Sequence, residues 1–168
     1  MRSTDGSDAS NGLTWANAEA TLTGAAAADV AGDVIWVSQV HAESTAAAVS
    51  FNWAGDAIDP IRILCGNDAA EPPTALATTG TVTTTGNSSI TCSVGSDYLY
   101  VYGITFNSGS GAIGTASIIL SAGGSVQVYD SCNFHLATTG TASVFQPIGA
   151  AGATVSLVNC GLQFSATA

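Results

Sequence analysis

Gly114-Thr115-Ala116-Ser117-Ile118 recurs as Gly140-Thr141-Ala142-Ser143-Val144, and a related stretch, Gly86-Asn87-Ser88-Ser89-Ile90, precedes both. The first two copies along the chain begin 28 residues apart, and the last two begin 26 residues apart. A period of roughly 20 to 50 residues is typical of solenoids, in which each unit buries its apolar face by stacking on its neighbours. We therefore expect Ile90, Ile118 and Val144 to stack on one face.

A strand-like segment follows each copy, with apolar residues alternating on both sides of a polar or glycine corner. These segments span residues 99–106, 126–134 and 155–162. We place their corners at Gly103, Asp130 and Asn159, residue types that tolerate unusual backbone dihedral angles. Because each unit consists of strands alone, the sequence predicts an all-β fold, a parallel β-helix solenoid.

The residues before the repeats supply a helix and further strands. Strands are predicted at 34–37, 48–53, 61–65 and 81–85, where β-branched and apolar residues cluster. A helix is predicted at about residues 16–30, capped by Thr14 and stopped by Gly32. We therefore divide the chain into a leader loop (1–13), an N-terminal capping helix (14–32) and a β-helix of about five coils (33–168), with the helix covering the first coil.

An antiparallel β-sandwich is the alternative all-β architecture. It predicts hairpin signals such as Asn-Gly or Asp-Gly between strands. Both dipeptides occur, at Asp5-Gly6 and Asn11-Gly12, but they lie before the helix. Their position favours the solenoid.

Composition excludes several classes of protein. Only 8% of the 168 residues are charged, against about 25% in an average globular protein, so a coiled coil or a solvated disordered tail is excluded. The chain has no lysine and a net charge of −10, which gives no electrostatic footprint for DNA, RNA or an anionic membrane. The first residues lack an apolar secretory signal, and the longest apolar run, 25–37, is broken by Asp29 and Asp33 and is too short to span a bilayer.

The four cysteines give no zinc-binding pattern, because they contain no C-x-x-C pair and only two histidines accompany them. We favour reduced, buried thiols over two disulfides. The spacings between Cys132 and Cys160, and between Cys65 and Cys92, are 28 and 27 residues, which predicts that each pair lies on successive coils.

The segment 5–15, the alanine-rich helix and Gly32-Asp33-Val34-Ile35-Trp36-Val37 together resemble the opening of right-handed parallel β-helix proteins of the pectin-lyase-like superfamily. More narrowly, residues 37–44 and the Ala- and Thr-rich coils that follow are similar to uncharacterised β-helix proteins encoded among phage and prophage structural genes. The resemblance implies a right-handed parallel β-helix. It is only suggestive for biology, because this superfamily hosts lyases, hydrolases, tailspikes, adhesins and structural rods.

Catalytic candidates are few. The resemblance to polysaccharide lyases implies a basic catalyst beside calcium-holding carboxylates, yet Arg2 lies in the leader and Arg62 on an uncharged strand. Glycoside hydrolysis needs two carboxylates within roughly 5 to 10 Å, and Asp130 and Asp97 have no acidic partner in register. We therefore predict no catalytic residue, and assign the corner residues Asp130 and Asn159 to backbone hydrogen bonding.

Other polar clusters have both a structural and a functional interpretation. Asp56 with Asp59, and Asp68 with Glu71, are interpreted as turn formers, with a carbohydrate groove or a cation site as the alternative. The leader offers the side-chain oxygens of Asp5, Asp8 and Asn11. Helix capping and turn formation explain these residues as well as a calcium site would.

His41 beside Glu43 is the one acid–base pair of note. We interpret His41 as an edge residue of the first coil and His135 as a loop residue. Gly123, Gly124 and Gly149 are interpreted as turn glycines rather than as a phosphate-binding loop.

A stripe of tyrosines remains. Tyr98, Tyr100 and Tyr102 share one strand face by their spacing of two, opposite Leu99 and Val101. Such a stripe stacks on sugars or forms a protein interface, or is simply an exposed strand.

These observations lead to a functional expectation. We expect a non-enzymatic structural protein of a phage virion, capsid-decorating or spike-like, located in the virion and assembled in the host cytoplasm. The alternatives are a carbohydrate-binding or polysaccharide-degrading tailspike and a bacterial surface adhesin. We expect no metal or other cofactor, no nucleic-acid or membrane partner, and contacts with other virion proteins, with host-surface carbohydrate as a further candidate partner. The last segment, 162–168, lacks a closing helix, so we expect further residues or neighbouring chains, first of all in a homotrimer, to cover it.

Overall fold

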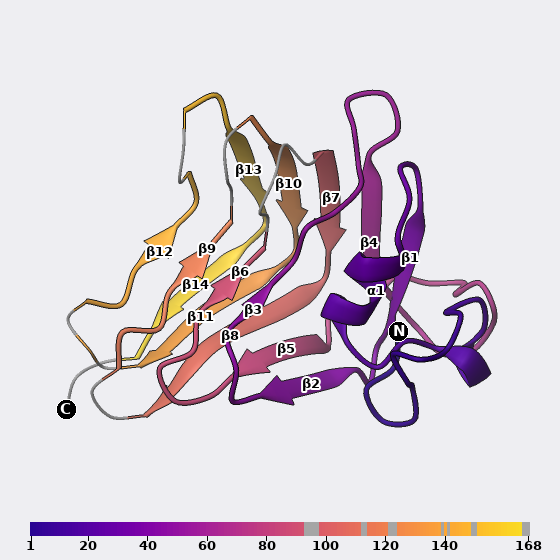
Figure 1. Ribbon diagram of the computed structural model, residues 1–168, viewed down its shortest axis with the longest axis horizontal. Helices are drawn as coiled ribbons and strands as arrows, with labels where there is room; N and C mark the ends of the chain where they lie inside the picture. The colour runs from indigo at the N-terminus through magenta and orange to yellow at the C-terminus, as the bar shows by residue number, and fades with distance from the viewer. Residues whose placement is uncertain are drawn as a thin grey trace.

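The chain winds into an all-β parallel solenoid of about four coils, with a short helix near the N-terminus (Figure 1). The computed structural model describes residues 1–92, 98–111, 114–120, 124–138, 140, 142–148 and 151–165. Three parallel sheets form the walls, and each coil passes through them in turn. Every pairing between the described strands is parallel, so the sandwich alternative is wrong.

The three sheets divide the strands by position in the coil. Sheet A contains β1 (Val34–Ser38), β4 (Ile61–Gly66), β7 (Tyr98–Tyr102), β10 (Val126–Asp130) and β13 (Thr154–Val158). Sheet B contains β2 (Ala42–Thr45), β5 (Gly80–Thr84), β8 (Ile104–Gly111), β11 (Asn133–Thr138) and β14 (Gly161–Phe164). Sheet C contains β3 (Val49–Ser50), β6 (Ile90–Thr91), β9 (Ile118–Ile119) and β12 (Phe145–Gln146). The expected five coils reduce to about four because the last pass has no described strand in sheet C.

Ladders of like residues fill the interior. On the sheet B side, Phe106 and Phe134 are in register and their rings stack at 5.5 Å between centroids. Tyr129, from sheet A, meets Phe134 edge-on at 5.4 Å. Aromatic pairs in these geometries contribute about 0.5 to 1.5 kcal/mol beyond the burial of their area. Stacking of equivalent positions therefore contributes to the stability of the core.

The repeat is confirmed with one shift in register. Ile118 lies beside Ile90, but its partner on the next coil is Phe145 and not the predicted Val144. Gly140 still lies directly against Gly114, where a Cβ would collide with a backbone oxygen. The chain therefore gains one residue between Gly140 and Phe145, which leaves Val144 49% exposed.

The corners between sheets A and B also differ by one position from the prediction. Gly103, Ser131 and Asn159 have positive φ angles of 75°, 54° and 52°. The corner residue of the middle coil is thus Ser131, and Asp130 is the last residue of β10. A serine at positive φ is unusual, because the left-handed region favours glycine and asparagine.

The predicted helix at 16–30 is shorter and divided. A 3₁₀ turn, η1 (Trp15–Asn17), is capped by Thr14, and α1 (Leu22–Ala28) is capped by Thr21. The two are separate because the Asp8 carboxylate accepts hydrogen bonds from the backbone N–H groups of Ala20 and Thr21, which holds that segment extended. In the described part of the chain, no helix has the length and apolarity needed to cross a membrane.

The helix α1 lies at the N-terminal end of the solenoid (Figure 1). Its buried residues, Leu22 and Ala25, join the hydrophobic core together with Met1 of the leader. The expectation that the helix covers the first coil is consistent with this placement.

An insertion interrupts the period early in the chain. Equivalent residues of β1 and β4, Val34 and Arg62, are 28 positions apart, whereas Arg62 and its partner in β7, Tyr100, are 38 apart. The extra residues belong to the loop 67–79, between β4 and β5. It returns to the leader, where the Ala70 carbonyl accepts a hydrogen bond from the Trp15 indole.

Candidate functional site

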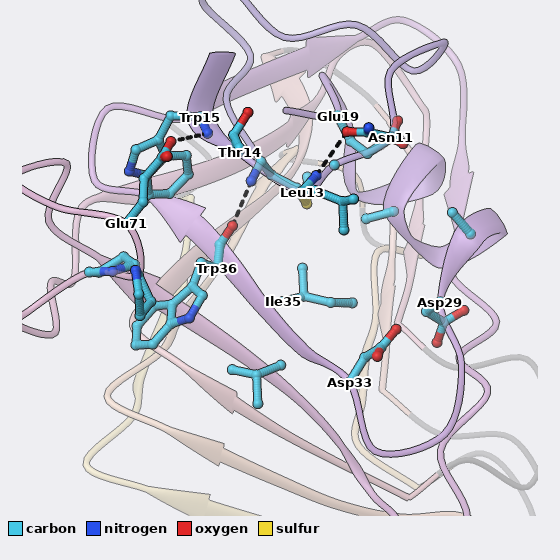
Figure 2. A pocket seen from close by; sticks show the side chains of 17 residues that line it. Asn11, Leu13, Thr14, Trp15, Glu19, Asp29, Asp33, Ile35, Trp36 and Glu71 are labelled. Carbon is cyan, nitrogen blue, oxygen red and sulfur yellow. Dashed lines mark hydrogen bonds between the residues drawn. The ribbon is translucent and has the colours of Figure 1, made fainter. Parts of the chain in front are cut away.

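A groove of about 650 Å³ lies at the N-terminal end of the solenoid. Four parts of the chain line it: leader residues 11–15, the end of α1, the first half of β1 and the insertion loop at Glu71, Pro72 and Pro73. Figure 2 shows Ile35 pointing into its middle, with Asp29 and Asp33 on one side and Trp15 and Glu71 on the other. Its volume lies within the range of roughly 300 to 1,000 Å³ that is usual for ligand sites.

Local hydrogen bonds fix the walls of the groove. The Asn11 side chain accepts from Leu13 N–H and turns the leader. The Glu71 carboxylate accepts from the backbone N–H of Trp15, which ties the insertion loop to the leader. Met1 pairs with the open edge of β1, donating to the Trp36 carbonyl and accepting from Ser38 N–H.

The groove is acidic. Its four carboxylates are those of Glu19, Asp29, Asp33 and Glu71, and neither arginine of the chain is among the lining residues. Asp29 and Asp33 accept hydrogen bonds from the backbone N–H groups of Ala54 and Val30 at 2.8 and 3.0 Å. Both carboxylates are therefore held in place at the wall of the groove.

Glu19 is the most buried of these acids, at 6% exposed. Its Oε2 atom has no hydrogen-bond partner among the described residues. Burial first, and then the neighbouring Asp8, raise the pKa of the Glu19 carboxyl above its ordinary value. Burial disfavours the charged form of a carboxyl group, and a nearby cation favours it.

The predicted acid–base pair lies at the start of β2, the outermost strand of sheet B, and is buried beneath the cap. The His41 and Glu43 side chains are 0% and 5% exposed, and His41 Nε2 is 3.5 Å from Glu43 Oε2. Glu43 accepts from Leu22 N–H, at the start of α1, and His41 Nδ1 accepts from Ser3 N–H. His41 thus lies at the edge of the first coil, as predicted, and the pair fastens the helix and the leader onto that coil.

The remaining acidic candidates are dispersed. Asp56 accepts from the N–H groups of Ile58 and Asp59 in an exposed turn, and these bonds lower the pKa of its carboxyl. Asp68 accepts from the Ser38 hydroxyl at 2.8 Å. Of the two predicted acidic pairs, only Glu71 reaches the groove.

The leader oxygens have separate partners. Asp5 forms an ion pair with Arg2 at 3.3 Å, while Asp8 and Asn11 accept from backbone N–H groups. Arg2 also lies over the Trp15 ring, 5.9 Å from its centroid. Across the described residues, no three His, Cys, Asp or Glu side chains converge as a metal site.

The outer face of sheet A carries the tyrosine stripe. Leu99 and Val101 are buried, and the three tyrosines alternate with them on the outer side, as predicted. The Tyr100 hydroxyl donates to the Asp130 carboxylate at 3.0 Å. Burial first, and then this neighbouring carboxylate, raise the pKa of Tyr100 to about 12.

Ladders extend the aromatic character of this face. Trp36, Leu64 and Tyr102 follow one another across neighbouring strands, and Arg62 lies exposed beside Tyr100.

The outer face of sheet B is polar and uncharged. One ladder across it contains Ser44, Thr83, Asn107, His135 and Gln163. His135 belongs to β11 and shares a 3.2 Å hydrogen bond with Ser165. Its interpretation as a loop residue is therefore wrong, because it occupies an outward strand position.

All four cysteines are free thiols. Cys132 and Cys160 follow equivalent corners of adjacent coils, as predicted. Cys65 and Cys92 do not, because Cys65 belongs to β4 of sheet A and Cys92 follows β6 of sheet C. The insertion loop lengthens the chain between them, so their 27-residue spacing does not reflect equivalent positions on successive coils.

Some predicted positions lie outside the described residues: Asp97, Gly123 and Gly149. The sequence pattern did not predict the groove, because the leader, the helix and the insertion loop meet only in the folded chain. The available signal was the clustering of Asp29 and Asp33 around Gly32, just before an apolar strand. Comparisons with protein-family models, with curated proteins and with solved structures find no match to this chain.

Proposed function

We propose that this chain is a structural component of a phage virion, a capsid-decorating or spike-like β-solenoid that makes contacts without catalysing a reaction. The observation that carries the proposal is the use of the acidic side chains. Asp8, Asp33, Glu43 and Asp56 all accept hydrogen bonds from backbone N–H groups. Side chains committed in this way hold turns and caps. The resemblance of residues 37–44 to phage-encoded β-helix proteins supports the same assignment.

Localisation tests this proposal. Cells that carry the gene are induced to release particles, which are banded on a density gradient and digested for mass spectrometry. We expect peptides of this chain to co-sediment with capsid proteins in a fixed ratio across the band. Recovery of the chain only from the unsedimented fraction would contradict a virion role. Purified chain added to particles that lack the gene serves as the control for adsorption.

Carbohydrate contact by a tailspike-like protein is the second candidate. The outward stripe of Tyr98, Tyr100 and Tyr102, extended by Trp36, favours it, because aromatic rings stack on the apolar faces of sugars. A glycan array with the chain and with Tyr98→Ala and Tyr102→Ala variants tests this candidate. We expect binding to be lost in both variants, while Thr83→Ala on the outer face of sheet B leaves it unchanged. Turnover of the bound glycan, abolished in Asp56→Asn or Asp130→Asn, would instead indicate an enzyme.

Lateral assembly into a homotrimer is proposed for the particle. The uncharged ladder of sheet B supports it, because copies that meet through Thr83, Asn107 and Gln163 bury no unpaired charge. Sedimentation equilibrium is expected to give three times the 16.6 kDa mass of the chain. Asn107→Lys is expected to shift the mass to that of the monomer. A wild-type monomer at all concentrations would refute lateral assembly.

A further inference from the structure

We propose that the N-terminal groove binds an extended peptide segment, rich in lysine or arginine, which adds to the open edge of β1 as an extra strand. This inference is independent of the virion proposal, since it concerns the ligand of a site whatever particle carries it.

The first step is the state of the β1 edge. β1 is the outermost strand of sheet A, and β4 is its one partner among the described strands. The Asp33 carbonyl accepts a hydrogen bond from Arg62 N–H. The backbone N–H and C=O groups of the odd-numbered residues of β1 therefore point to β4, and those of the even-numbered residues point to the opposite edge. Trp36 N–H and the Val34 carbonyl therefore point to the groove. Neither group has a hydrogen-bond partner within the described part of the chain.

Met1 forms strand-like hydrogen bonds with this edge of β1. Its nitrogen donates to the Trp36 carbonyl at 2.6 Å, and its carbonyl accepts from Ser38 N–H at 2.9 Å. These two bonds form a parallel bridge opposite Val37. A peptide residue opposite Ile35 would make the same bridge, donating to the Val34 carbonyl and accepting from Trp36 N–H. Peptides bind exposed sheet edges in this way, with the backbone giving affinity and the side chains giving specificity.

The second step is charge. Glu19, Asp29, Asp33 and Glu71 line the groove, and no basic side chain does so. The whole chain carries a net charge of −10. A peptide with cationic side chains would gain charge-assisted hydrogen bonds to these carboxylates, whereas an acidic peptide would be repelled.

The third step is the apolar part of the lining. Ile35 lies in the middle of the groove, and Trp15 and Trp36 stand at its margin (Figure 2). Side chains of an added strand alternate between two faces. One set would therefore pack beside Ile35 on the inner face, and the other would pack beside Trp36 on the outer face, where arginine or lysine also gains cation–π contact. An alternating apolar and basic sequence fits both requirements.

The experiment uses the whole chain and a blocked heptapeptide of alternating valine and lysine. Binding is followed by calorimetry and by the amide resonance of Trp36 in a nitrogen-15 spectrum. Saturable binding below about 1 mM is expected, with Trp36 among the amides that shift most. Methylation of alternate peptide nitrogens is expected to weaken binding by about tenfold, because it removes the strand hydrogen bonds.

Charge-matched variants separate the groove from the general acidity of the chain. Asp33→Asn keeps an acceptor for Val30 N–H but removes a groove charge, so we expect about threefold weaker binding. Asp56→Asn removes the same charge from a distant exposed turn and is expected to leave the affinity unchanged.

Three results with the peptides would overturn the proposal. They are equal binding of the N-methylated peptide, equal binding of a valine–glutamate peptide, and no saturation up to about 1 mM. Equal weakening by the two Asp→Asn variants would show diffuse electrostatic adsorption and would also refute a groove site.

Discussion

The two ends of the solenoid differ in how far their apolar side chains are exposed to solvent. At the N-terminal end, α1 and the leader cover the first coil, and Leu22 is 1% exposed. At the other end, β13 and β14 carry Leu157, Leu162 and Phe164 at 38%, 49% and 61% exposure. Their partners on the preceding coil, Tyr129, Phe134 and Leu136, are 0% to 2% exposed. The same inward position is thus core or surface according to whether another layer lies beyond it, which is the energetic rule of a stacked repeat.

The largest expected effect comes from truncating one leucine at each end. Leu22→Ala leaves a cavity beneath the cap and is expected to lower the free energy of unfolding by about 2 to 5 kcal/mol. Leu162→Ala removes a half-exposed side chain and is expected to cost less than about 1 kcal/mol. Urea unfolding followed by circular dichroism measures both. Equal losses would show that the two ends are equally packed in solution.

A smaller effect is expected from the polar fastening of the cap. Glu43→Ala leaves Leu22 N–H buried without an acceptor and removes the carboxylate 3.5 Å from His41 Nε2, which is expected to cost about 1 to 3 kcal/mol. Ser44→Ala, at the next and exposed position of β2, is the matched control and is expected to change stability little. Hydrogen exchange is expected to show the loss first in α1. Uniform loss along the solenoid would instead indicate that the cap and the coils unfold as one unit.

The pH dependence of stability gives a third comparison within the acidic end. Folding raises the pKa of the Glu19 carboxyl. The contribution of Glu19 to the free energy of unfolding is therefore fully present below its unfolded pKa, and it is lost as the pH rises through its folded pKa. Glu19→Gln is therefore expected to stabilise the protein most at neutral pH and least in acid. The pKa of Asp56 is lowered, so its contribution is present above its unfolded pKa and lost on acidification.

Asp56→Asn is accordingly expected to destabilise the protein most at neutral pH and least in acid. Unfolding midpoints measured from acid to neutral pH test both signs. Parallel pH profiles for the two variants would contradict them.

The smallest effect on stability is expected from the thiol of the last coil. Cys160 is partly exposed, so Cys160→Ser is expected to change stability by less than about 0.5 kcal/mol. Cys160 is nevertheless expected to react first with a thiol reagent under native conditions. Cys132, one coil further in, is buried, and burial raises its pKa to about 12. Loss of the fast labelling phase in Cys160→Ser checks the assignment, and a fast phase that persists would refute it.

The sequence predicted the parallel coils because their evidence is local. Alternation around Gly103 and Asn159 and the repeated Gly-Ser stretches are visible without tertiary structure. The strand β2 was missed because Glu43, an acid, occupies its inward position and contacts a helix that is distant in the chain. The groove was missed for the same reason, since the Trp15 contact with Glu71 joins residues 56 positions apart. One-residue errors at Val144 and Asp130 arose because a repeat alignment does not reveal where an extra residue is accommodated.

The uniform direction of strand addition has a consequence for synthesis on the ribosome. Each sheet begins with a strand of the first coil, β1, β2 or β3, and every later strand pairs with one already made. The leader and α1, which cover that first coil, precede it in the chain and therefore leave the exit tunnel before it. At about 5 to 20 residues per second, a coil of 28 residues emerges in about 1 to 6 seconds. The nascent chain can therefore fold vectorially, with each new coil templated by the one before it.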